Sequence, residues 1–189
     1  MTSNIILIGP VGAGKSTQGH LLAEKLGLPR CSMDDRRWDY YREIGYSEEI
    51  ARQIIDKEGF LGLYHYWKPF EAYAVERLLG DSHGSVIDFG AGHSVFEDDA
   101  LFARVQSAMQ PCRNVVLLLP SPDLDDSVRF LRERTWDGMA GEFDFHEHFV
   151  KHHSNHDLAK FVVYTKDKTP EQTRDEIIAL VSHAPTGET

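Results

Sequence analysis

Residues 9–16 constrain this chain more than any other stretch. Their sequence, Gly-Pro-Val-Gly-Ala-Gly-Lys-Ser, matches the phosphate-binding pattern GxxxxGK[ST] in full. An apolar run at residues 5–8 precedes the loop, and a helical pattern with Leu21, Leu22 and Leu26 on one face follows it. In a strand–loop–helix unit, backbone N–H groups converge on phosphate oxygens and the helix adds the positive end of its dipole. The sequence therefore predicts a nucleoside triphosphate site.

Two polar side chains of the loop have expected roles. We expect Lys15 to reach the β- and γ-phosphates of ATP and the Ser16 hydroxyl to ligate Mg²⁺. Asp88 ends an apolar strand, where an acid can hold Mg²⁺ through water; the alternative is a buried acid that backbone donors satisfy. The predicted metal residues are Ser16 and Asp88. The predicted nucleotide-binding residues are Gly9, Val11, Gly12, Ala13, Gly14, Lys15, Ser16, Thr17 and Arg129.

Five apolar stretches alternate with helical patterns along the chain. The expected strands are residues 4–8, 29–33, 85–89, 114–119 and 161–164. This alternation predicts a three-layer α/β fold, with a five-stranded, mainly parallel sheet and helices on both faces. Right-handed crossovers then place the active site at the carboxyl ends of the strands.

The same patterns predict the domain organisation. We expect one domain over residues 1–183, followed by a loose tail at residues 184–189. A helical region at about residues 34–80 is expected to bind the phosphate acceptor. Residues 135–155 lose the helical periodicity and are rich in glycine, histidine and acid, which predicts a lid with some helix.

The expected acceptor-binding region contains several local signals. Ser47 predicts a helix start, and Ile50, Ile54 and Ile55 are expected to face inward. Gly59 and Gly62 interrupt the helical pattern, and Pro69 predicts a kink or a fresh helix start. We therefore expect this region to consist of several short helices.

The loop and the order of the elements resemble the small kinases of the shikimate kinase and gluconate kinase group, within the nucleoside monophosphate kinase-like fold. The resemblance covers nearly the whole chain in element order, while only the loop is highly specific. It implies a P-loop NTPase fold and an ATP-dependent kinase. The implied reaction transfers the γ-phosphate to a hydroxyl of a small polar or anionic metabolite.

The resemblance also implies the acceptor side of the site. Ser32-Met33-Asp34 stands where the family carries Asp-x-Asp, so Asp34 takes the acceptor-contacting position and Ser32 replaces the metal-side aspartate. Asp34 also suits a helix N-cap, which is the alternative interpretation. The implied catalytic residues are Lys15, Asp34, Arg132 and Arg134, with the arginines in the lid. The implied acceptor-binding residues are Asp34, Lys68, Glu71, Gly90, Ala91, Gly92 and Lys151.

Two lysines depart from the family pattern. Lys68 and Lys151 stand where the family carries arginines that hold the shikimate carboxylate. A lysine does not form the bidentate fork of a guanidinium with a carboxylate. The two lysines therefore disfavour shikimate itself as the acceptor.

An aromatic cluster leaves other functions open. Its side chains either stack on a ring of the substrate or pack the helical region. Stacking favours a nucleoside or nucleotide kinase on the same scaffold. A regulatory NTP-binding or NTPase module is the rival from another class, and a zeta-toxin-like kinase of sugar nucleotides has no specific feature here. The cluster consists of Trp38, Tyr40, Tyr41, Tyr64, Tyr66 and Trp67.

Composition and charge limit the kinds of partner that the protein is expected to bind. The formal net charge of −10 argues against nucleic-acid binding, and no apolar stretch has the length of a membrane span. Two isolated cysteines form no CxxC pattern. Five histidines between residues 146 and 156 lack a fixed ligand spacing, so we expect a polar lid rather than a metal site there. We expect a cytoplasmic enzyme, monomeric or homodimeric, that uses ATP, Mg²⁺ and a small-molecule acceptor.

Overall fold

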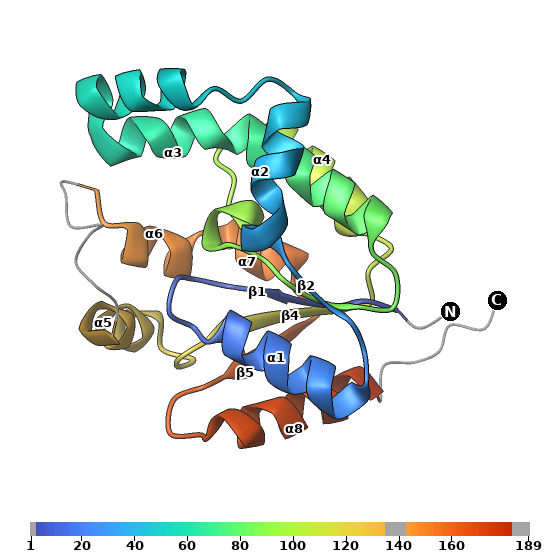
Figure 1. The fold of residues 1–189 in the computed structure, drawn as a ribbon. Helices are drawn as coiled ribbons and strands as arrows, with labels where there is room; N and C mark the ends of the chain where they lie inside the picture. The colour runs from blue at the N-terminus through green and yellow to red at the C-terminus, as the bar shows by residue number, and fades with distance from the viewer. Residues whose placement is uncertain (1–2, 135–142, 183–189) are drawn as a thin grey trace.

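A five-stranded parallel sheet forms the centre of the fold. The structure, a computed structural model, describes residues 3–134 and 143–182. The strands lie in the order β2-β3-β1-β4-β5, and each adjacent pair is parallel (Figure 1). The predicted sheet is confirmed. The strands are β1 (Ile5–Ile8), β2 (Arg30–Ser32), β3 (Val86–Asp88), β4 (Asn114–Leu119) and β5 (Phe161–Tyr164).

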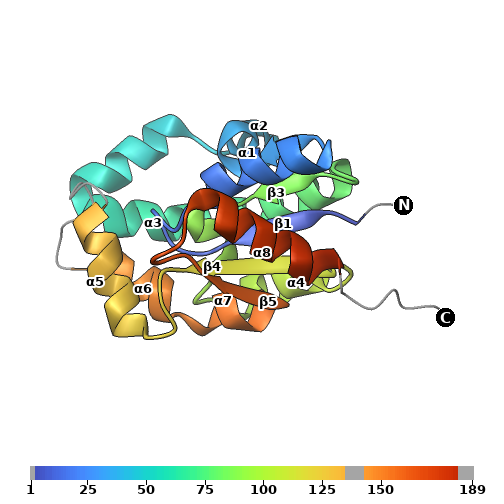
Figure 2. The same ribbon diagram turned by 90° about the horizontal axis from the view of Figure 1, so that it is seen from below.

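Helices cover both faces of this sheet, which confirms the predicted three layers. Helices α1 and α8 lie together on one face, while α3, α4 and α7 lie on the other (Figures 1 and 2). Helices α5 and α6 pack together at one end of the sheet (Figure 2). The helices are α1 (Lys15–Leu26), α2 (Met33–Glu43), α3 (Glu48–Asp81), the 3₁₀ helix η1 (Ala91–Ser94), α4 (Asp99–Met109), α5 (Leu124–Arg134), α6 (Phe145–Lys151), α7 (His153–Leu158) and α8 (Pro170–Ser182).

Strand β1 shows why its sequence is a continuous apolar run. Ile6 and Ile8 belong to the core cluster beneath α3 and α4. Ile5 and Leu7 belong to the cluster beneath α1 and α8. Successive side chains of a strand point to opposite faces, so a strand covered on both faces needs apolar residues at every position.

Helix α3 breaks at Gly59, as the sequence predicts, but the break expected at Gly62 is wrong, because the helix continues through that residue. Gly59 has φ 66° and ψ −162°, and the chain turns back on itself there (Figure 1). Ser47 caps the first arm by accepting a hydrogen bond from the Ile50 backbone N–H at 3.3 Å. The expectation that Ile50 and Ile55 face inward is wrong, because their exposed fractions are 45% and 44%. The arm before Gly59 extends past the core instead of packing on it.

The kink expected at Pro69 is also absent, because the second arm of α3 continues through it. A proline inside a helix leaves the carbonyl four residues earlier without its N–H donor. That carbonyl belongs to His65, and both His65 and Pro69 are exposed. Water can therefore hydrogen-bond to the carbonyl, which makes the uninterrupted helix tolerable at this position.

The region predicted as a lid has a packed part. Residues 135–142 lie outside the described residues, as does the predicted tail at 184–189. Ser154 and Asn155 are buried in α7, where Ser154 Oγ hydrogen-bonds to the Phe96 backbone and Asn155 Nδ2 donates to the Phe149 carbonyl. The last residues of the predicted lid are thus part of the body of the domain.

Candidate active site

The phosphate-binding loop follows β1 and leads into α1. Gly9, Gly12 and Gly14 have φ of 133°, 79° and 97°, values that favour glycine. A Cβ on Gly9 would lie 2.5 Å from the Leu118 carbonyl oxygen, so the loop passes β4 too closely for any side chain. No side chain caps the start of α1. The N–H groups of its first turn are therefore available to an anion.

Lys15 lies folded over this loop. Its ammonium donates to the carbonyls of Gly9 and Pro10, both at 2.8 Å. Burial lowers the pKa of Lys15 to about 8, although the charges of Asp34 and Asp88 act in the opposite direction. The neighbouring Ser16 and Thr17 are exposed. The loop thus presents backbone donors, one cation and a hydroxyl to the same space.

Asp88 has a partner that neither interpretation of the sequence anticipated. Its Oδ2 accepts a hydrogen bond from Arg30 Nη2 at 2.8 Å, and the residue is 2% exposed. The other oxygen, Oδ1, has no hydrogen-bond partner and faces Gly19 of α1. The pairing of β2 with β3 brings Arg30 into reach. One carboxylate oxygen remains free, so a metal-side role for Asp88 stays a prediction.

A cavity of about 280 Å³ adjoins the loop, with Val11 in its wall. It lies among α2, α3, η1 and the end of α6. Its polar wall consists of Asp34, Arg37, Glu71 and His93, and its aromatic wall consists of Phe60, Tyr64, Trp67 and Phe149. Gly90, Ala91 and Gly92 line the remainder.

The glycine turn after β3 lets the polar side chains approach the backbone. A Cβ on Gly90 would lie 2.8 Å from His93 Nδ1 and 3.0 Å from Asp34 Oδ1. A Cβ on Gly92 would collide with Glu71 Oε1. The fold thus brings together Asp34, Glu71 and the glycine turn, which the sequence predicted as acceptor-binding residues.

Lys68 is placed differently from the expectation. Its ammonium donates to the carbonyls of Gly92 and Val95, both at 3.0 Å, and lies 2.5 Å from Glu71 Oε2. Lys68 is 4% exposed and does not line the cavity. Burial raises the pKa of the Glu71 carboxyl, and Lys68 opposes this shift. With three partners for three donors, Lys68 supports the glycine turn from behind.

Lys151 also lies away from the cavity. Its ammonium forms ion pairs with Asp125 of α5 and Glu147 of α6, both at 2.7 Å. These contacts tie α6 to α5.

The three arginines predicted for the nucleotide and the lid occur on α5. Arg129 pairs with Asp126, Arg132 pairs with Asp144, and the Arg134 guanidinium lies 5.0 Å from the centre of the Phe130 ring. All three arginines are exposed, and none lines the cavity. Their catalytic and nucleotide-binding roles stay predictions.

Arg37 is a cavity residue that the sequence analysis missed. Its Nη1 lies 3.7 Å from Asp34 Oδ1, and its guanidinium lies 4.5 Å and 5.6 Å from the ring centres of Trp38 and Trp67. The sequence spacing between Asp34 and Arg37 could have identified it, because residues i and i+3 share one face of a helix that begins at Met33.

His93 follows the glycine turn, and the sequence left two interpretations of it, a contact with the acceptor or an ordinary loop histidine. It is 1% exposed and its Nε2 lies 3.2 Å from the Tyr41 hydroxyl. Burial, followed by the charges of Arg37 and Lys68, holds the pKa of His93 well below its ordinary value. His93 is therefore a neutral imidazole in the cavity wall.

The members of the aromatic cluster divide between the core and the cavity wall, and stacking on a substrate ring stays a prediction for those in the wall. Tyr40 and Tyr41 are buried in the core, and the Tyr66 hydroxyl accepts a hydrogen bond from the Ser47 N–H. Tyr64 and Trp67 line the cavity.

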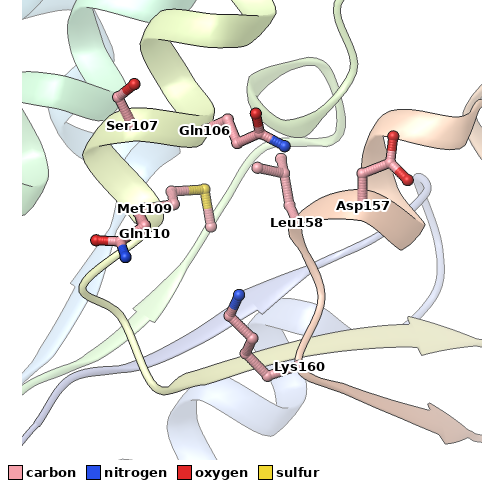
Figure 3. A pocket seen from close by; sticks show the side chains of 7 residues that line it. All are labelled: Gln106, Ser107, Met109, Gln110, Asp157, Leu158 and Lys160. Carbon is pink, nitrogen blue, oxygen red and sulfur yellow. The ribbon is translucent and has the colours of Figure 1, made fainter.

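A second cavity, also of about 280 Å³, lies near the amino ends of β4 and β5, at the opposite edge of the sheet from the loop (Figure 3). Met109, Leu158 and Lys160 are among its lining residues. Within residues 3–134 and 143–182, no group of three or more His, Cys, Asp or Glu side chains is arranged to hold a metal ion. Over the same residues, no helix combines the length and apolarity needed to cross a membrane.

Comparisons with known proteins agree with this description. No protein-family model matches the chain. A shikimate kinase of Persephonella marina is 36% identical over 89 residues, which are 47% of this chain and 48% of that enzyme. The match thus spans about half the length of this relative.

Solved structures match over nearly the whole chain. The structure of shikimate kinase from Acinetobacter baumannii in complex with shikimate has a TM-score of 0.67 at 21% identity, covering 99% of this chain and 97% of that one. A gluconokinase from Sinorhizobium meliloti has a TM-score of 0.53 at 15% identity, covering 96% and 93%. The chain has the P-loop NTPase fold of these kinases, and its predicted resemblance to the shikimate and gluconate kinase group is confirmed.

Proposed function

We propose that this protein is an ATP-dependent kinase that transfers the γ-phosphate to a hydroxyl of a small molecule in the cavity beside the loop. One observation carries the proposal: the cavity that Asp34 lines adjoins the phosphate-binding loop, whose Val11 forms part of the same wall. An acidic side chain of the acceptor pocket thus shares a cavity with the loop expected to hold the transferred phosphate. The similarity to shikimate kinases supports the same reaction class.

The mechanism relies on positioning and electrostatics. The loop N–H groups bind the phosphates, and Lys15 exchanges its contacts with two loop carbonyls for the β- and γ-phosphates. Asp34 orients the acceptor hydroxyl and accepts its proton. Magnesium-bound ATP is the phosphoryl donor, and Ser16 and Asp88 would hold the ion. Arginines 129, 132 and 134 would neutralise charge on the γ-phosphate when the lid closes.

The first test is the Lys15→Met variant. The acceptor is sought by incubating the protein with ATP, Mg²⁺ and hydroxy acids, sugars or nucleosides, and following ADP release. With the acceptor found, Lys15→Met is expected to lower turnover at least about 1,000-fold, because it removes the cation at the developing charge. Lys25→Met changes an exposed lysine of the same helix and should leave turnover unchanged. Near-normal turnover of Lys15→Met would refute the mechanism.

The second test separates the two substrates. Asp34→Asn is expected to lower turnover about 100-fold and to leave the dissociation constant of ATP within about twofold, because Asp34 acts on the acceptor. Asp35→Asn, at the exposed neighbouring position, is the control. If Asp34→Asn chiefly weakens ATP binding, the acceptor-side assignment is wrong.

A nucleoside or nucleotide kinase is the second candidate, because Tyr64 and Trp67 provide aromatic surface in the cavity wall. Phosphorylation of nucleosides but not of hydroxy acids or sugars would favour it. A regulatory NTPase predicts slow ATP hydrolysis that no acceptor accelerates.

A further inference from the structure

The acceptor cavity holds most of the unpartnered buried nitrogens in the structure. Within the described part of the chain, four buried side-chain nitrogens have no hydrogen-bond partner. Three of them, Arg37 Nε, Trp67 Nε1 and His93 Nδ1, belong to residues of the cavity wall. A buried donor without a partner is unfavourable, because it has lost its hydrogen bond to water and gained none in the protein. Their concentration in one cavity indicates a ligand that supplies acceptor oxygens.

Arg37 and Trp67 supply the unpartnered donors of this wall. A guanidinium and an indole carry N–H groups and no acceptor nitrogen, so Arg37 Nε and Trp67 Nε1 can only donate. The His93 ring is held on two sides, because its Nε2 lies 3.2 Å from the Tyr41 hydroxyl and the Gly90 backbone interacts with the side chain. A ligand oxygen would therefore pair with Arg37 and Trp67.

Arg37 is the cation of this wall. Lys68 is engaged with Glu71 and two carbonyls, and Lys151 pairs with Asp125 and Glu147. The two positions at which the family resemblance placed anion-binding arginines are therefore occupied with structural contacts. Arg37 has only a distant ion pair with Asp34 at 3.7 Å, and the rings of Trp38 and Trp67 flank its guanidinium.

The chemistry of these donors favours a carboxylate. The Nε–H and one Nη–H of an arginine point in parallel and match the two oxygens of a carboxylate. A single guanidinium balances one negative charge, whereas a phosphate dianion carries close to two. Glu71 and Asp34 add negative charge to the wall, and Lys68 offsets that of Glu71.

We propose that Arg37, with the N–H group of Trp67 beside it, binds a carboxylate of the acceptor and determines specificity for a hydroxy acid. This inference rests on the proposed kinase function and adds the class of its acceptor. The family resemblance places an anion-binding residue on α3, at Lys68. In this chain the anion-binding residue would instead lie on α2, within one helical turn of Asp34. The hydroxyl and the carboxylate of the substrate would then contact the same helix.

The test measures binding of three acids and their neutral counterparts to the ADP-loaded full chain by calorimetry. The pairs are shikimate and methyl shikimate, gluconate and glucitol, and mandelate and mandelamide. The wild-type protein is expected to bind at least one acid about tenfold or more tightly than its counterpart. Arg37→Gln should remove this preference and leave binding of the neutral compound and of ADP unchanged. Arg37→Lys should keep part of the preference for the acid, because it retains the positive charge.

The matched control is Arg36→Gln, which removes the same charge from the exposed neighbouring position and should keep the preference. The inference is overturned if no acid binds more tightly than its counterpart, or if Arg36→Gln and Arg37→Gln have equal effects. Acids that bind through Arg37 but never accept phosphate would contradict the kinase and leave this inference standing. Phosphate transfer to neutral alcohols, at a rate that Arg37→Gln does not change, would support the kinase and contradict this inference.

Discussion

The two halves of the candidate site are built in different ways. The phosphate-binding half consists of eight consecutive residues, and backbone N–H groups supply most of its donors. The acceptor half is a set of side chains from α2, α3, η1 and α6. Backbone geometry follows from a short sequence pattern, whereas the acceptor half exists only when distant elements meet. One fold can therefore keep its phosphate donor and change its acceptor.

The two halves also use a buried lysine differently. Lys15 is held by two loop carbonyls, which are neutral partners that it can leave when phosphates arrive. Lys68 is held by two carbonyls and the carboxylate of Glu71, and every partner is internal to the fold. The first lysine is available for function, and the second maintains the shape of the cavity.

The largest expected effect tests the structural role of Lys68. Lys68→Met should lower the free energy of unfolding by about 3–5 kcal/mol, because it leaves the buried Glu71 carboxylate without its cation. Urea denaturation measures this change. Lys151→Met removes an exposed ion-pair partner and should change the free energy of unfolding far less, because solvent screens the pair.

Two further results bear on this prediction. The double variant Lys68→Met/Glu71→Gln should recover part of the lost stability, since it removes the unpaired charge. If Lys68→Met instead keeps wild-type stability and loses only acceptor binding, Lys68 is a substrate ligand, as the family resemblance implies.

The next effect concerns the backbone of the phosphate-binding half. Gly9→Ala should cost about 2 kcal/mol and weaken ADP binding, because its φ of 133° and the Leu118 carbonyl exclude a Cβ. Gly80→Ala is the control, since no atom lies within 4 Å of its Cβ position in α3. That variant should be neutral or slightly stabilising. Equal effects of the two substitutions would show that the loop tolerates a shift.

An effect of similar size is the pH dependence that Lys15 contributes without nucleotide. The pKa of Lys15 is about 8 in the fold and 10.5 ordinarily, so between these values the unfolded chain binds the additional proton. The free energy of unfolding should therefore rise with pH across this window, relative to Lys15→Met, by up to about 3 kcal/mol. Urea denaturation of both proteins at pH 7.5 and 10 measures the difference, and a constant difference would contradict the burial of the ammonium.

Most of the fold could be predicted from the sequence, because short patterns determine it. The apolar runs gave the five strands, and the glycine pattern gave the loop and the start of α1. The exposure of Ile50 and Ile55 was not predictable, since the helical pattern does not reveal that the arm before Gly59 extends past the core. The continuous helix through Pro69 depends on an exposed carbonyl, which is also a tertiary property.

The acceptor side shows the same limit. Asp34, Glu71 and the glycine turn could be predicted from a family resemblance, and the fold brings them together. Arg37 could have been found from its helical spacing to Asp34. The role of Lys68 could not, because its partners at Gly92 and Val95 lie more than twenty residues away. Likewise, the contact between His93 and Tyr41 joins residues more than fifty positions apart, and no local pattern contains it.

The break in α3 has a geometric consequence. Gly59 is the joint between the exposed arm and the body, and the next residue, Phe60, is part of the aromatic wall of the cavity. Joint and wall are consecutive residues, so the backbone angles of Gly59 set the direction in which the exposed arm leaves the edge of the acceptor cavity. The entrance to the pocket and the branching point of α3 are thus the same place in the chain.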